Sequence, residues 1–99
     1  MDHEFIKNGS TLTVRPAGRM DTVTSPILHQ QILSELEGIT ELILDLERVD
    51  YLSSGGLRVL LALDQEIKSR NGNIKLLHVN EYIREVFEIT GFLPMLTIE

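Results

Sequence analysis

The feature that most limits how this chain can fold is a short polar segment, Ser53-Ser54-Gly55-Gly56, between two apolar stretches. Residues 42–46 before it form a nearly continuous apolar run, which is typical of a central strand covered on both faces. From residue 55 to about residue 69, apolar side chains recur at helical spacing. The polar segment therefore lies where a helix begins, directly after a buried strand and its connection.

The start of a helix has a chemistry of its own. Its first turn leaves backbone N–H groups without intrahelical partners, and the helix dipole places partial positive charge there. Ser is among the best residues to cap this end, and Gly lets the backbone bend tightly or approach a neighbour closely. Ser54 could therefore be an ordinary helix cap. The same geometry could also hold an anion, or a phosphate esterified to Ser54 itself.

The rest of the chain alternates between strand and helix patterns. Strands are predicted at residues 4–7, 11–16, 41–46, 74–79 and 93–98, with a loop at residues 18–21. Asn8-Gly9 predicts a hairpin between the first two strands. This order favours an α/β fold: a single-layer mixed, largely parallel sheet of four or five strands packed with three or four helices. We expect residues 1–99 to form one domain.

Start and stop signals flank the predicted helices. Thr24 or Ser25 can cap the first helix with Pro26 at its first position, and Gly38 can end it. Asn80 can cap the last helix, and Gly91 can end that helix in a left-handed conformation.

The phase of the middle helix predicts which way Ser54 faces. At roughly 100° per residue, one side collects the apolar core positions: Gly56, Val59, Leu60, Leu63 and Ile67. The opposite side collects Arg58 and Leu61, and Ser54 projects toward it. Leu61 is either a singly exposed apolar residue, which is common, or the anchor of a surface that binds a partner.

Composition excludes several classes of function. The net charge of −6 argues against binding to nucleic acids, and the chain has no Cys. Because the three histidines, His3, His29 and His78, lack metal-ligand spacing, no metal site is expected. The sequence contains neither a nucleotide-binding glycine loop nor a nucleophile elbow, so no catalytic residue is predicted. With no signal sequence and no long apolar stretch, we expect a cytoplasmic protein without membrane contact.

These motifs together resemble the STAS domain family, the bacterial anti-sigma factor antagonists. Gly56-Leu57 matches the family's Gly-Leu pair, and Ser54, two residues before it, matches the phosphorylatable Ser. Gly55 takes a small position, and Ser53 stands where the family often has Asp. The segment from Gly18 to Thr22 is similar to the family's Gly-x-x-Asp, with Asp21 as the acid. The resemblance extends from about residue 12 to residue 98.

The resemblance implies a protein that binds rather than catalyses and that needs no cofactor. Its unphosphorylated form would bind an anti-sigma factor, typically a Ser/Thr kinase of the histidine-kinase-like ATPase type, and release a sigma factor. That kinase would phosphorylate Ser54 and end the interaction, and a PP2C-type phosphatase would reverse the modification. The implied partner-binding surface consists of Asp21, Ser53, Ser54, Gly55, Arg58 and Leu61.

Two other functions remain open at this point. The chain could be a structural subunit of a larger assembly, such as the STAS-like partner of a lipid-transport ATPase, with Ser54 as a simple cap. It could also be a module that holds an anion or a nucleotide at the turn of Ser54, Gly55 and Gly56. Ser53 is the rival site of modification.

Overall fold

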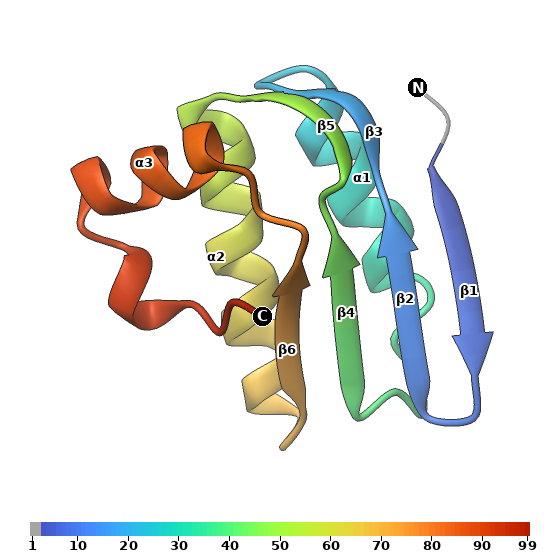
Figure 1. The fold of residues 1–99 in the computed structure, drawn as a ribbon. Coiled ribbons are helices and arrows are strands. Elements are labelled where there is room, and N and C mark those ends of the chain that lie inside the picture. The colour runs from blue at the N-terminus through green and yellow to red at the C-terminus, as the bar shows by residue number, and fades with distance from the viewer. Residues whose placement is uncertain (1–2) are drawn as a thin grey trace.

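Four strands form the main sheet in the computed structural model, which describes residues 3–99. β1 (Glu4–Asn8) and β2 (Thr11–Arg15) are the two strands of the predicted hairpin and run antiparallel. β4 (Glu41–Asp45) and β6 (Asn73–Leu77) extend the sheet in parallel, which gives the order β1-β2-β4-β6 (Figure 1). The predicted mixed, largely parallel sheet is confirmed.

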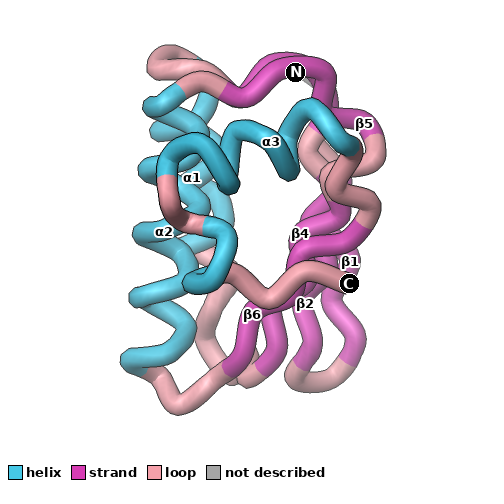
Figure 2. Tube along the Cα trace, turned by 60° about the vertical axis from the view of Figure 1, so that its left-hand side comes forward, coloured by secondary structure: helices cyan, strands magenta, loops and turns pink. Residues whose placement is uncertain are grey.

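Three helices pack with this sheet. α1 (Thr24–Leu33) and α2 (Ser54–Ser69) lie side by side on one face. α3 (Glu81–Thr90) lies beyond β6 and spans from the helix layer toward the strands (Figure 2). The expectation that β4 is covered on both faces is wrong: Leu42 and Leu44 are buried under the helices, whereas Ile43 points to the other face and is half-buried.

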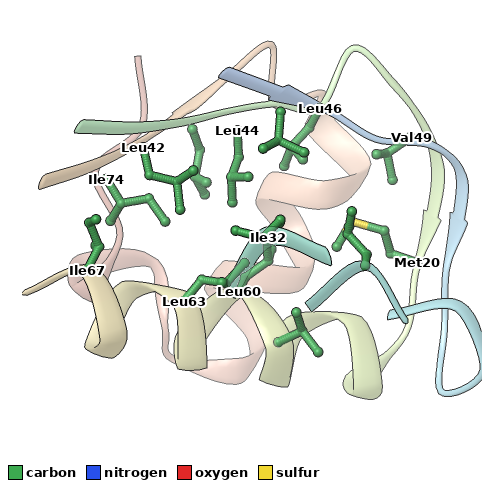
Figure 3. Close-up of a cluster of buried hydrophobic side chains, with 14 of the residues drawn as sticks. Met20, Ile32, Leu42, Leu44, Leu46, Val49, Leu60, Leu63, Ile67 and Ile74 are labelled. Carbon is green, nitrogen blue, oxygen red and sulfur yellow. The ribbon is translucent and has the colours of Figure 1, made fainter. Parts of the chain in front are cut away.

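The core lies between the sheet and the two helices α1 and α2. Figure 3 shows side chains from both layers meeting there, among them Leu42 and Leu44 from β4 and Leu60 and Leu63 from α2. Each fully buried side chain of this size contributes about 1.5–3 kcal/mol by leaving water. The predicted core side of α2 is confirmed, and Leu57 is buried as well.

A second, two-stranded sheet was not predicted. Residues 18–21, expected to be a loop, contain most of β3 (Ala17–Met20), which pairs in parallel with β5 (Arg48–Leu52). Pro16 lacks a backbone N–H and separates β3 from β2, and a bulge at Gly18 interrupts the new pairing. β3 and β5 therefore continue beyond the main sheet and end beside the start of α2 (Figure 1).

Several predicted ends need correction. α1 ends at Leu33 rather than at Gly38, because residues 34–40 form turns. The strand expected at residues 93–98 is mostly absent: Leu93–Met95 is a short 3-10 helix that contains Pro94, and only Ile98 forms a bridge, with Leu76.

Both signals at the ends of α3 are confirmed. The Asn80 side chain accepts a hydrogen bond from the Ile83 N–H at 2.8 Å. Gly91 ends the helix with φ of 80°, in the left-handed region. This ending turns the chain back, so that Phe92 packs against the core.

A cluster of charges lies where β2, β4 and β6 end. His78 Nδ1 lies 2.7 Å from Asp45 Oδ1, and Arg15 Nε lies 3.4 Å from the other oxygen of Asp45. The hydrogen bond and the charge of Asp45 raise the pKa of His78 above its usual value. Burial raises the pKa of Asp45. The interactions with His78, the Glu47 N–H and Arg15 together outweigh this effect, so the pKa lies below its usual value.

His78 should make folding stability depend on pH. Because its folded-state pKa is raised, the contribution of His78 is complete below its ordinary pKa and is lost as pH rises through the raised value. The stability lost in His78→Asn should therefore be larger at about pH 6 than at about pH 9. Asn suits this position because His78 has φ of 56°.

Thermal unfolding of the native chain and of His78→Asn, measured from about pH 6 to about pH 9, tests this prediction. His29→Asn is the matched control, because His29 makes no side-chain hydrogen bond or ion pair in the part of the chain that the structure describes. An equal loss of stability in His78→Asn at every pH would contradict the prediction.

Candidate functional site

Ser53, and not Ser54, caps α2. Ser53 has extended backbone angles, and its Oγ accepts a hydrogen bond from the Gly56 N–H at 3.3 Å. Ser54 is the first residue inside the helix. The interpretation of Ser54 as an ordinary cap is therefore wrong, and the helix begins one residue before the predicted start at residue 55.

The cap is tied directly to the end of β3. The Met20 carbonyl oxygen accepts one hydrogen bond from the Ser53 N–H at 2.9 Å and another from the Ser53 hydroxyl at 3.3 Å. A Cβ on Gly56 would collide with this same carbonyl oxygen and would lie 2.7 Å from Leu52 Cδ1. Only Gly allows the first turn of α2 to lie this close to β3.

Gly55 lies close to Thr22, two residues after Met20. A Cβ there would lie 2.7 Å from Thr22 Cγ2 and 3.0 Å from Thr22 Cα. Both glycines are buried, and each faces the backbone of its own chain. Internal packing therefore accounts for the missing side chains of both glycines, and the approach of an anion or a nucleotide is not needed to explain them.

Asp21 holds the start of α1. Its Oδ1 accepts hydrogen bonds from the Thr24 N–H at 2.8 Å and the Val23 N–H at 2.9 Å. These two backbone bonds, chiefly that of Thr24, hold the pKa of Asp21 below its ordinary value. Asp21 therefore supplies the side-chain cap that was expected from Thr24 or Ser25.

Two residues missed by the sequence analysis flank Asp21. Arg19 Nε lies 3.7 Å from Asp21 Oδ2, and the Arg19 guanidinium carbon lies 4.1 Å from the centre of the Tyr51 ring. Arg19 and Tyr51 face each other across the parallel pair β3 and β5. Since that pairing was not predicted, no signal in the sequence joined them.

A concave cavity with a volume of about 280 Å³ adjoins Ser54. It is lined by Ser54, Leu57, Arg58, Leu61, Thr90 and Phe92, and we call it the α2–α3 groove. Leu61 is half-buried and packs against the core, so its prediction as an outward-facing residue is only partly correct. The chain reversal at Gly91 places Phe92 in the same groove as Leu61, which the sequence did not indicate.

Ser54 is exposed and lines this groove. Within residues 3–99 its hydroxyl makes no hydrogen bond, in contrast to the hydroxyl of its neighbour Ser53. Its capping role is taken by Ser53, so the fold makes no demand on it. An exposed, unbonded hydroxyl at a helix start, on the lining of a partly apolar groove, is suited to covalent modification and to contact with another protein.

The six residues predicted for the partner surface lie in one region, but Gly55 is buried against Thr22 and is not itself part of the surface. Asp21 joins it because its neighbours Met20 and Thr22 contact the start of α2. Arg58 and Leu61 follow Ser54 along the groove. Two large apolar side chains are exposed at the start of α1: Val23, which directly precedes the helix, and Ile27 within it, with 72% and 59% of their surface accessible. The sequence analysis missed both.

In residues 3–99, no group of three or more His, Asp or Glu side chains is arranged to hold a metal ion. None of the helices in this range combines the length and apolar character that crossing a membrane requires.

The different roles of the two serines give a stability prediction. Ser53→Ala should lower the free energy of unfolding by about 1 kcal/mol, because the α2 cap and its bond to Met20 are lost. Ser54→Ala should change it by less than about 0.5 kcal/mol, since an exposed side chain without bonds is removed. Denaturant unfolding of both variants measures the difference, and a larger loss in Ser54→Ala would refute the assignment of the cap.

Comparison with known proteins adds a family to this geometry. The sequence model of the STAS domain matches residues 3–99. BtrV of Bordetella bronchiseptica, described as a candidate anti-sigma factor antagonist, is 33% identical over 82 residues, which cover 82% of this chain and 71% of BtrV. The anti-sigma-B factor antagonist of Bacillus subtilis is 28% identical over 92 residues, which cover 93% of this chain and 84% of that protein.

The fold matches solved structures with little sequence identity. The anti-sigma factor antagonist SpoIIAA in its unphosphorylated form superimposes with a TM-score of 0.84 at 21% identity, over 99% of this chain and 88% of that one. SpoIIAA of Bacillus in its phosphorylated form gives 0.77 at 21% identity, over 99% and 91%. At this identity the likeness establishes the fold alone.

Proposed function

This chain belongs to the STAS domain family, and from that premise we propose that it is an anti-sigma factor antagonist switched by phosphorylation of Ser54. Proteins of the anti-sigma factor antagonist family are non-enzymatic regulators. The unphosphorylated form would bind an anti-sigma factor, which is also a Ser/Thr kinase of the histidine-kinase-like ATPase type, and thereby release a sigma factor in the cytoplasm. A PP2C-type phosphatase would regenerate the binding form.

The observation that carries the proposal is the free hydroxyl of Ser54. A kinase must reach its acceptor hydroxyl without unfolding the substrate, and Ser54 is exposed and unbonded among the described residues. Ser53 is less accessible and uses its hydroxyl both to cap α2 and to bind Met20. The geometry therefore favours Ser54 over its rival.

The surroundings of Ser54 suit a protein partner. The α2–α3 groove offers the apolar side chains of Leu57, Leu61 and Phe92 beside the cation of Arg58. Exposed Val23 extends the apolar surface on the side of Asp21. Interfaces typically combine a few apolar anchors with charged residues at their margin, and this region offers both.

Phosphorylation at this position would act on the complex and not on the fold. A phosphate adds about −1.5 to −2 charges and three acceptor oxygens. The start of a helix tolerates negative charge well, so α2 would remain formed. A partner surface packed against Ser54 would meet both the added charge and the added volume, and binding would be lost.

Intact-mass measurement tests the switch. After incubation with ATP and a lysate of the source organism, the native chain should gain the mass of one phosphate, and Ser54→Ala should gain none. Ser53→Ala is the matched control and should still be phosphorylated, because its Ser54 hydroxyl is unchanged.

Phosphorylation that persists in Ser54→Ala and disappears in Ser53→Ala would move the site to Ser53. No phosphate on the native chain under any growth condition would contradict the proposal and leave a structural subunit, such as one of a lipid-transport ATPase, as the better account.

A further inference from the structure

Arg58 stands apart from the other cations of this protein. The chain has nine Lys and Arg residues and a net charge of −6. Among the residues that the structure describes, ion pairs engage all of them except Arg58 and Arg84. Arg84 nevertheless lies among Glu81, Glu85 and Glu88. No carboxylate lines the groove that Arg58 shares with Ser54.

The helix directs Arg58 toward Ser54. The two residues are four apart, so they lie on the same face of α2, one turn from each other. Side chains of a helix lean toward its N-terminus and cover the preceding turn. The long side chain of Arg58 therefore extends over the turn that begins with Ser54, and both residues line the same concave surface.

A guanidinium in this place is matched to a phosphate. Its planar arrangement of N–H donors binds two phosphate oxygens at once, and charge-assisted bonds of this kind are roughly twice as strong as neutral ones. Arg58 would not need to break an existing ion pair to form them, because it has none within residues 3–99. Arg19, another cation near the site, is already engaged by Asp21 and the Tyr51 ring.

We propose that Arg58 binds the phosphate on Ser54, so that modification withdraws this cation from the α2–α3 groove. The inference rests on the proposed function, in which Ser54 is phosphorylated. In the unmodified chain, Arg58 is available to a carboxylate of the protein partner, as the acidic character of the rest of this chain leaves few other cations free. Phosphorylation then removes two contacts at once, the Ser54 hydroxyl and the Arg58 charge.

The test uses a chain in which phosphoserine is installed at position 54 during synthesis, so that no kinase is required. The second ionisation of a phosphoserine has a pKa of about 6. Because Arg58 favours the doubly charged phosphate, the pKa measured by ³¹P NMR should be about 0.5 or more lower in the native background than in Arg58→Gln. That difference is a roughly threefold change in the acid dissociation constant.

Arg70→Gln is the matched control. It removes the same charge from the end of the same helix, where Arg70 pairs with Glu66 at 2.8 Å, and it should leave the phosphate pKa unchanged. Arg58→Lys should restore part of the difference. Equal phosphate pKa values in the native and Arg58→Gln backgrounds, or an equal change in Arg70→Gln, would overturn the proposal.

The outcome is independent of whether a kinase modifies the chain in its organism. If the lysate experiment yields no phosphate but the titration shows the Arg58 effect, the switch fails as a function while the chemistry of the site stands. If the lysate experiment succeeds and the titration shows no effect, Ser54 is the switch and Arg58 takes no part in it.

Discussion

The site depends on one close contact, between the end of β3 and the first turn of α2. The Met20 carbonyl oxygen accepts two hydrogen bonds from Ser53, and Gly56 lets the helix start lie against the same carbonyl. This contact fixes where α2 begins and which way its first residues face. It also brings Thr22, and with it Asp21, to the edge of the surface around Ser54. A side chain at Gly56 would separate the two segments and with them the site.

The same contact gives two adjacent serines different roles. Ser53 is committed to the fold through its cap and its bonds to Met20, and Ser54 is left with an unbonded hydroxyl within the described residues. Asp21 is likewise committed, since it accepts two backbone bonds at the start of α1. A modification of Ser54 can therefore change the surface of the protein without opening its structure, which is what a switch between binding partners requires.

The sequence predicted what depends on local pattern. The apolar period of α2, the caps of α3 at Asn80 and Gly91, and the mixed sheet were all correct. The errors arose where distant segments meet. The β3–β5 pairing was not predicted because these segments show no clear hydrophobic alternation. Whether Ser53 or Ser54 caps α2 depends on the position of Met20, which bonds to Ser53. The α2–α3 groove was also missed, because it combines residues of α2 with Thr90 and Phe92, which are distant in the sequence.

The central claim is that phosphorylation of Ser54 changes the surface and leaves the fold intact. The most direct test compares amide NMR spectra and hydrogen exchange of the unmodified chain with those of a chain carrying phosphoserine at position 54. We expect chemical-shift changes only around the α2–α3 groove and the first turn of α2, with the Ser53 amide, bonded to Met20, equally protected in both. Faster exchange of that amide, or shift changes that spread through the core, would contradict the claim.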